Sequence, residues 1–294
     1  MVRALASVAV EPRPSAARTK GRVLSVPVFR RGEEASDLVA VEEPLELRIG
    51  GDVLGVLMRT PGDDHRLALG FLFSERIIES AADVTAVYHC GRPGAEGYGS
   101  SIEVTPASGA RIDWARLDGA RRSFTGGSAC GACGRQTVTD LLDGMEPPAP
   151  GPVFAPGAVA EAVASLRDHQ PVFEATGATH AAALWDRSGA LVAGHEDVGR
   201  HNAVDKVIGA LLLAREEARR RRGAAPEPAL LAVTSRAGLD VLQKAVRARI
   251  PVVATISAPT SLGVEMASRS GLTLAAFVRG GRVNVYSGRE RIRP

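Results

Sequence analysis

The chain is poor in cysteine and lysine, and it has no long apolar run. Three cysteines among 294 residues cannot form a disulfide framework, and their odd number leaves at least one thiol unpaired. No apolar run approaches the roughly 18 residues of a membrane-spanning helix. Glu11 and two prolines follow the first short apolar run, where a signal peptide would have its cleavage site. We therefore expect a cytoplasmic protein that does not enter a membrane.

The composition and charge are those of an ordinary folded protein. Hydrophobic residues make up 45% of the chain, and 36 basic against 33 acidic residues give a formal net charge of +3. These values exclude wholesale disorder, a collagen-like repeat and a coiled coil, and the length suits one large or two modest domains. Only Lys20, Lys206 and Lys244 are lysines. Genomic base composition is the simplest explanation, although guanidinium groups also suit bidentate capture of phosphate. We expect no nucleic-acid partner.

The first part of the chain predicts a small α+β unit. Residues 1–21 are rich in Ala, Pro and Arg without a sustained period, which indicates a flexible N-terminal leader. Over residues 22–125 we expect an α+β lobe, with Asp63 as a candidate helix cap. Its expected elements are a hairpin around Gly50-Gly51, a helix over 63–78, and strands over 82–90 and 101–106.

The second part alternates strand-like and helical segments. Residues 126–152 hold a glycine-rich cysteine loop and the linker GMEPPAPGP, and residues 153–294 have the pattern of an α/β domain. The predicted strands cover 180–186, 189–197, 229–235, 251–257, 272–278 and 282–287, and the predicted helices cover 198–221, 238–249 and 260–270.

A CxxC motif, Cys130 and Cys133 in GGSACGACG, is the first feature that carries chemistry. The glycines around it favour an accessible loop. Such a motif can hold half of a zinc site, cycle between dithiol and disulfide, or present a nucleophilic thiolate. Zinc needs about four ligands, whereas Cys90 is isolated, no second CxxC is present and the six histidines form no HExxH motif. We therefore expect no protein-ligated metal.

The remaining interpretations of the motif stay open at this point. A thioredoxin-like dithiol normally follows a strand near the start of its domain, whereas this one lies in the middle of the chain. A buried structural pair fits poorly beside four glycines. A persulfide carrier needs a reachable thiolate with a lowered pKa, and positive charge from Arg121, Arg122 and Arg135 is available nearby. The carrier interpretation fits best.

Two polar clusters interrupt the apolar segments of the α/β domain. The first cluster consists of two neighbouring segments, TGATHAAAL at 176–184 and GHEDVGRHNAVDK at 194–206. Its titratable or polar side chains are Thr179, His180, His195, Glu196, Asp197, Arg200, His201 and Asp205. Each one alone is explained by capping or ion pairing, with Asp197 capping the long helix and Asp205 and Lys206 on its wet face. Together they predict a site at the strand ends.

The second cluster lies in FVRGGRVNVYS at 277–287. Gly280-Gly281 allows the backbone to approach a ligand closely, and Arg279 and Arg282 flank it with guanidinium groups. This combination suits a pyrophosphate, and a plain hairpin turn between two strands explains it equally well.

Taken together, these segments resemble one family, the formate dehydrogenase accessory sulfurtransferases (FdhD). The resemblance covers roughly residues 22–290, and it runs through EEPLELRIGG, LALGFLFSERII, GGSACGACG, the stretch TGATHAAALWDRSGALVAGHEDVGRHNAVDKVIG, and SRAGLDVLQKAVRARIPVVATISAPTSLGVEMASRSGLTLAAFVRGGRVNVYS. Ala178 stands where some relatives have another cysteine, which excludes a functional thiol there, and Cys90 has no clear counterpart.

The resemblance implies a sulfur carrier. In such a protein a cysteine desulfurase donates sulfur as a persulfide, which passes to a bis(molybdopterin guanine dinucleotide) molybdenum or tungsten cofactor before that cofactor enters formate dehydrogenase. The persulfide position falls on Cys130, with Cys133 in support. The cofactor-binding stretch falls on Val278, Arg279, Gly280, Gly281, Arg282 and Val283.

The resemblance also implies a fold and an assembly. The fold class is α/β, with a small N-terminal lobe and a core that resembles cytidine deaminases but lacks their zinc site, commonly as a homodimer. Two alternative functions remain. The chain would then be either a noncatalytic chaperone that binds the cofactor and formate dehydrogenase, or a dithiol oxidoreductase.

Overall fold

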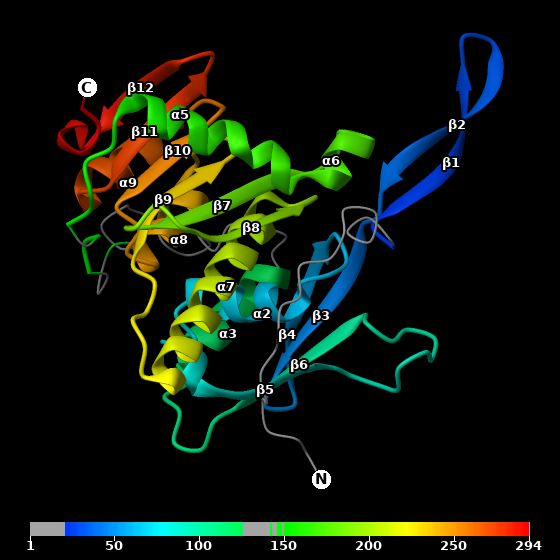
Figure 1. Cartoon of the computed structure of the whole chain (residues 1–294). Coiled ribbons are helices and arrows are strands. Elements are labelled where there is room, and N and C mark those ends of the chain that lie inside the picture. The colour runs from blue at the N-terminus through cyan, green and yellow to red at the C-terminus, as the bar shows by residue number, and fades with distance from the viewer. Residues whose placement is uncertain (1–20, 126–141, 143–145, 149, 294) are drawn as a thin grey trace.

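The computed structural model describes residues 21–125, 142, 146–148 and 150–293 (Figure 1). Within them, three sheets and several helices form a mixed α/β structure, as the sequence predicts. No described helix is both long enough and apolar enough to cross a membrane.

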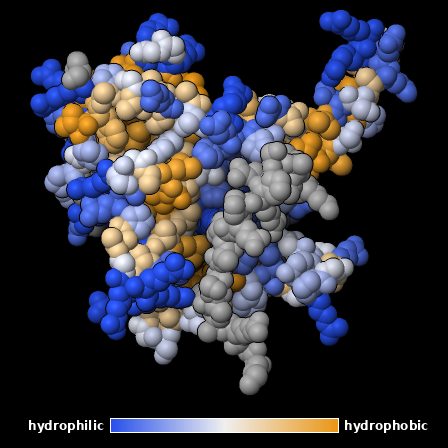
Figure 2. Space-filling view, viewed as in Figure 1, coloured by the Kyte–Doolittle hydropathy of each residue, from blue (hydrophilic) through white to orange (hydrophobic). Residues whose placement is uncertain are grey.

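The first sheet is a two-stranded ribbon that projects from the body of the molecule (Figure 1). Strand β1 (Val23–Arg30) pairs with the antiparallel strand β2 (Glu33–Ala40) through a tight turn. The ribbon exposes large apolar side chains, among them Phe29 at 74%, and Figure 2 shows apolar surface near its base. This ribbon was not predicted from the sequence as a separate element.

The N-terminal lobe (residues 43–125) is a four-stranded sheet in the order β4-β3-β6-β5, covered by helices. Gly50 and Gly51 have φ values of 60° and 89°, and they form the predicted turn between β3 and β4. The elements are β3 (Glu43–Ile49), β4 (Asp52–Arg59), α2 (Asp64–Ser74), η1 (Ala81–Asp83), β5 (Val84–His89), β6 (Ser101–Pro106) and α3 (Trp114–Thr125).

Helix α2 is shorter than the pattern predicts, and its start is different. It ends at Ser74 because Arg76 adopts a left-handed conformation with φ 61°, although Ile77 and Ile78 remain fully buried. Asp63 precedes the helix, also with a left-handed φ, and its side chain makes no capping hydrogen bond. The expectation that Asp63 caps this helix is therefore wrong.

The C-terminal domain (residues 150–293) contains a six-stranded sheet in the order β12-β11-β10-β9-β7-β8. The three neighbours β9, β10 and β11 are parallel, whereas β7, β8 and β12 pair antiparallel. The strands are β7 (His180–Asp186), β8 (Leu191–Asp197), β9 (Pro228–Val233), β10 (Val252–Thr255), β11 (Thr273–Arg279) and β12 (Arg282–Ser287).

Helices cover both faces of this sheet, and its side chains divide accordingly. Along β9, Leu231 and Val233 pack with the helices of one face, whereas Leu230 and Ala232 pack with Val159 on the other. The first face carries α7 (Arg200–Arg221), α8 (Leu239–Arg247) and α9 (Ser261–Ser270). The second face carries α5 (Pro156–Ala164) and η2 (Ser165–His169) (Figure 1). The short helix α6 (Pro171–Thr176) packs against the β1–β2 ribbon, and η3 (Arg289–Arg291) follows the last strand.

The lobe and the domain are joined where α2 packs on α7. A Cβ at Gly70 would lie 1.8 Å from the carbonyl oxygen of Asp205, and one at Gly209 would lie 2.0 Å from that of Arg66. Each helix therefore presents a glycine to the backbone of the other, and only glycine permits this separation. The predicted helix and strand segments of both parts are thus brought into one core.

Candidate functional site

The hairpin between β11 and β12 holds the arginine-glycine stretch that the sequence analysis selected. Arg279 and Arg282 are directly paired across the turn, and Gly280 and Gly281 form it with φ values of 56° and 77°. A β-carbon would be strained at both glycines. The turn is exposed, as are both arginines.

The two arginines line a small cavity at this hairpin. Phe277, Arg279, Arg282 and Asn284 enclose a volume of about 120 Å³. Neither guanidinium makes a hydrogen bond or an ion pair with any residue that the structure describes. Like charges placed directly across a ribbon repel each other. A bound phosphate would relieve that repulsion, because it accepts hydrogen bonds from both guanidinium groups.

The flanking valines have a different role from the arginines. Val278 is buried and packs in the core beneath the sheet, and Val283 is half-buried against the same cluster. They fix the hairpin on the domain and do not reach the cavity. Phe277 and Asn284 were not predicted as site residues. Asn284 lies two positions after Arg282, so the period-2 alternation of a strand was a usable signal for it.

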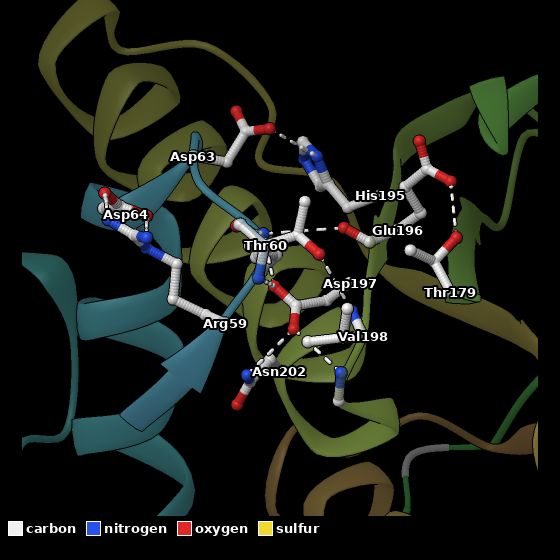
Figure 3. A network of polar contacts seen from close by, with 12 residues as sticks. Arg59, Thr60, Asp63, Asp64, Thr179, His195, Glu196, Asp197, Val198 and Asn202 are labelled. Carbon is white, nitrogen blue, oxygen red and sulfur yellow. Dashed lines mark hydrogen bonds and ion pairs between the residues drawn. The ribbon is translucent and has the colours of Figure 1, made fainter. Parts of the chain in front are cut away.

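The polar cluster of residues 176–206 does not form one site. Glu196, for example, is buried and accepts hydrogen bonds from the Thr179 hydroxyl at 2.8 Å and from the backbone N–H groups of Val172 at 2.8 Å and Phe173 at 3.0 Å (Figure 3). The carboxylate thus caps the start of α6. This part of the cluster is structural.

Asp197 is also structural, and it binds the two parts of the molecule together. Its carboxylate accepts hydrogen bonds from the Thr60 N–H at 3.2 Å and from Asn202 Nδ2 at 2.9 Å (Figure 3). It also lies 2.6 Å from the Lys206 ammonium and accepts the Gly199 N–H at 2.9 Å. Asp197 therefore contacts the residue before α7 and does not cap the first N–H groups of the helix as expected.

Asp205 and Lys206 do not lie on the wet face of the long helix, as the sequence analysis expected. Asp205 is 1% exposed and Lys206 is 0% exposed. Asp205 accepts hydrogen bonds from the Ser74 hydroxyl at 2.7 Å and from Lys244 at 2.7 and 2.8 Å. The N-terminal lobe and α8 cover this side of α7, which a single-helix pattern does not reveal.

His195 faces Asp63 across the junction of the two parts. Its Nδ1 lies 3.3 Å from Asp63 Oδ2 (Figure 3). Arg66 binds the other oxygen of that carboxylate. Burial acts to raise the pKa of Asp63, but the contacts with His195 and Arg66 outweigh it and hold the pKa well below its usual range. Burial lowers the pKa of His195. This pair stabilises the junction.

His180, Arg200 and His201 form the remaining part of the cluster, at the edge where the parallel strands end. The Asp240 carboxylate lies 3.0 Å from His201 Nδ1 and 3.2 Å from Arg200 Nε. Burial acts to raise the pKa of Asp240, and the contacts with His201 and Arg200 lower it to about 2. Burial lowers the pKa of His180, and the positive charges of Arg200 and His201 lower it further.

Cys130 and Cys133 lie outside the described residues, as do Arg135 and the side chain of Arg122. Arg121 is described, and it forms ion pairs with Asp52 and Asp118. Cys90 has a free, half-exposed thiol at the end of β5. No group of three His, Cys, Asp or Glu side chains that could hold a metal occurs among the residues described.

The chain is similar to a family of known sequences over most of its length. A family model with the description FdhD/NarQ family matches residues 40–293. The sulfur carrier protein FdhD of Anaeromyxobacter dehalogenans strain 2CP-1 is 51% identical over 277 residues, which cover 94% of this chain and 96% of that protein. The protein of the same name from Nocardia farcinica is 44% identical over 259 residues, which cover 87% and 88%.

A solved structure is similar as well. The crystal structure of a formate dehydrogenase accessory protein from Desulfotalea psychrophila superposes with a TM-score of 0.68 at 28% sequence identity. The match covers 92% of this chain and 98% of that one. The arrangement of lobe, domain and hairpin described above is therefore that of a known fold.

Proposed function

The chain belongs to the FdhD/NarQ family, and on this basis we propose that it is a cytoplasmic sulfurtransferase that supplies sulfur to the cofactor of formate dehydrogenase. One observation carries the proposal: relatives named sulfur carrier proteins match the chain over 94% of its length at 51% identity. The similarity to a formate dehydrogenase accessory protein supports the choice of recipient enzyme.

In the proposed first step, Cys130 receives sulfur from a cysteine desulfurase. The Cys130 thiolate attacks the terminal sulfur of the donor's persulfide, a new S–S bond forms on Cys130, and the donor's thiolate leaves. No electrons are gained or lost overall, because one S–S bond replaces another. The sequence around Cys130 and Cys133 is rich in glycine, which suits a thiol that two large partners must reach in turn.

In the second step, the sulfur passes to the cargo, a bis(molybdopterin guanine dinucleotide) cofactor that is a substrate and not a resident group. Release of the sulfur as hydrosulfide consumes two electrons. Formation of a disulfide with Cys133, three positions after Cys130, provides them. The Cys133 thiolate attacks Cys130 Sγ, a Cys130–Cys133 disulfide forms, and hydrosulfide leaves. Cellular thiols then reduce the disulfide. If Cys133 only donates a hydrogen bond to the persulfide, the acceptor attacks the terminal sulfur directly.

The hairpin is the proposed holding site for the cargo. Its exposed guanidinium groups, Arg279 and Arg282, are free of partners among the described residues and point to a ligand with phosphate groups. The pyrophosphate of a guanine dinucleotide has that chemistry. Apart from the adjoining residues, no described atom lies within 4 Å of the position of a Cβ at Gly280 or Gly281, so a ligand can approach the backbone of the turn closely.

The finer features of the fold and assembly are proposals too. We infer that the C-terminal domain is related to the cytidine deaminases, supported by its antiparallel hairpin of β7 and β8 beside three parallel strands with helices α7, α8 and α9 on one face. A homodimer is the proposed assembly, and a mass twice that of the chain in light scattering would support it.

The sulfur-loading test measures the protein's mass after incubation with a cysteine desulfurase and free cysteine. The native chain and the control variant Cys90→Ala should each gain the mass of one sulfur atom, and Cys130→Ala should gain none. Equal loading of Cys130→Ala would overturn the carrier function. In that case, formate dehydrogenase activity in cells that express the Cys130→Ala, Cys133→Ala variant would identify the chain as a noncatalytic chaperone. Reduction of a generic disulfide would identify it as a dithiol oxidoreductase.

A further inference from the structure

The ribbon of β1 and β2 has no part in the proposed sulfur transfer, although it projects clear of the body of the molecule (Figure 1). Its base is fixed to the domain, because the Arg22 guanidinium donates to the Glu196 carbonyl at 3.3 Å and α6 packs against the strands. A two-stranded ribbon in water is marginally stable at best. A partner strand that pairs with the projecting part would therefore stabilise it.

The pairing of the two strands determines which backbone groups face outward. The Val41 N–H donates to the Arg22 carbonyl at 2.9 Å, and the register continues from this pair to Arg30 opposite Glu33. In an antiparallel ribbon, hydrogen-bonded pairs alternate with pairs whose backbone groups point away from each other. The outward-facing residues are Val23, Ser25, Pro27 and Phe29 on β1, and Glu34, Ser36, Leu38 and Ala40 on β2.

The two edges of the ribbon differ in their ability to pair. Pro27 closes the edge of β1, because its outward-facing nitrogen carries no hydrogen. Strand β2 contains no proline, and the outward N–H groups of Glu34 and Ser36 have no acceptor among the residues that the structure describes. The N–H of Leu38 donates to Asp37 Oδ1 at 2.9 Å. A further strand can therefore add beside β2 and not beside β1.

The edge of β2 is acidic near the turn. The strand has the sequence EEASDLVA, with three acids and no basic residue. Asp37 is paired with Arg30 of β1, whereas Glu33 and Glu34 are exposed and form no ion pair with any residue described. The cations of the ribbon, Arg30 and Arg31, lie on β1 and in the turn. Basic side chains on an added strand would therefore find two free carboxylates beside them.

Near the base, the same edge is apolar. Leu38 is 44% exposed and Val39 is 39% exposed. Successive residues of a strand point to opposite faces, so one of these side chains lies on each face of the ribbon. An added strand would cover both with alternate apolar side chains.

A second copy of the chain fits this edge poorly. Pairing β2 with the β2 of another copy would set each acidic half against the acids or the apolar residues of the other strand, and neither strand supplies a cation. Like charges on neighbouring strands weaken their pairing. A segment that is basic in one half and apolar in the other has the complementary pattern.

We propose that the free edge of β2 docks an extended segment of a partner protein by strand addition. Basic side chains of that segment face Glu33 and Glu34, and its apolar side chains cover Leu38 and Val39. The backbone hydrogen bonds provide affinity, and the side chains provide specificity. The inference goes beyond the sulfur transfer and does not depend on the chemistry of Cys130.

The test is fluorescence anisotropy of a labelled synthetic peptide with the full-length chain. The peptide has the length of β2, eight residues, with lysine in one half and valine in the other, each alternating with threonine. It is prepared in both sequence directions, because an added strand can run parallel or antiparallel. One direction should bind, and glutamate in place of lysine should weaken that binding. Binding of neither direction would overturn the proposal.

Two proline variants compare the edges of the ribbon. Ser36→Pro should weaken peptide binding about 10-fold or more, because it removes an outward N–H and places a ring at the free edge. Ser25→Pro is the matched control, since Ser25 is also exposed and faces outward, but on β1. It should leave the affinity within about twofold. Equal weakening by both variants would contradict docking at β2.

A charge variant tests the same edge without a change to the backbone. Glu33→Gln combined with Glu34→Gln should weaken binding about 3- to 10-fold at low salt and reduce its dependence on salt. Glu96→Gln, which changes an exposed acid in the loop between β5 and β6, should have no effect. The proposal is wrong if neither Ser36→Pro nor the charge variant changes the affinity.

Light scattering separates a partner protein from a second copy. The mass of the native chain and that of Ser36→Pro should be the same. A lower mass for Ser36→Pro would identify the edge of β2 as an interface between two copies, and docking of a partner protein there would be wrong.

Discussion

The junction between the N-terminal lobe and the C-terminal domain and the carboxyl edge of the six-stranded sheet are both rich in charge, but they use it differently. At the junction, Lys206 binds Asp197 and Lys244 binds Asp205, and all four side chains are buried. At the edge, Arg236, Arg279 and Arg282 have no charged partner among the described residues. A buried charge needs a partner in the fold itself, whereas an exposed charge without one is available to a ligand.

The largest expected loss of stability comes from replacing Lys206 at the junction. Lys206→Ala leaves the Asp197 carboxylate buried without its cation, which should lower the free energy of unfolding by about 3–5 kcal/mol. Urea denaturation at neutral pH measures it. Lys206→Met keeps most of the apolar stem and removes only the charge. It should therefore lower the free energy of unfolding by nearly as much as Lys206→Ala. A Lys206→Met variant as stable as the native chain would show that the ion pair contributes nothing.

An intermediate effect concerns Asp240, the one acid in the lining of a cavity of about 270 Å³ at the carboxyl edge of the sheet. Its pKa is lowered to about 2 in the folded chain, against roughly 3.9 when unfolded. Because the folded value is the lower one, Asp240 contributes stability above pH 4 that is lost as the pH falls towards 2. The contribution is about 2 kcal/mol.

Thermal unfolding between pH 5 and pH 2 measures that contribution, with Asp240→Asn as the comparison. The native chain should lose more stability than Asp240→Asn over this interval. An equal loss in both would mean that the contacts of Asp240 with His201 and Arg200 do not stabilise the fold.

The smallest effect on stability belongs to the hairpin. Arg279→Gln and Arg282→Gln should each change the free energy of unfolding by less than about 0.5 kcal/mol, because neither side chain has a partner in the described structure. Sulfur loading of Cys130 should persist, while formate dehydrogenase activity in cells falls. A large loss of stability in either variant would show that the hairpin arginines stabilise the fold, as the charges at the junction do, and would contradict the difference between the two regions.

Local patterns predicted the parts of the molecule whose determinants are close in sequence. Neighbouring residues determine three of these features: the turn at Gly50-Gly51, the strands of the C-terminal domain, and the pairing of Arg279 with Arg282. The cavity lined by Asp240 was not predicted as such, because Arg200, Arg236 and Thr260 meet only through the sheet order.

The errors in the sequence analysis have the same physical origin. Helical periodicity placed Asp205 and Lys206 towards water, and it contained no information about the lobe that covers α7. Asp63 has the residue type and position of a cap, but its side chain turns to His195, more than a hundred positions later in the sequence. In both cases, side chains bind partners from distant segments instead of the solvent or the local backbone that the sequence pattern predicted.

The junction also sets the order in which the chain can fold during its synthesis. Lys206 donates to the Thr60 carbonyl 146 positions earlier, and the backbone of α7 packs directly on the glycine of α2. The N-terminal lobe leaves the ribosome before the helix that covers it. At about 5–20 residues per second, the face of α2 that packs on α7 stays uncovered for roughly 7–30 seconds. Such distant contacts also slow folding. A chaperone that shields α2 during this interval would raise the yield of folded protein.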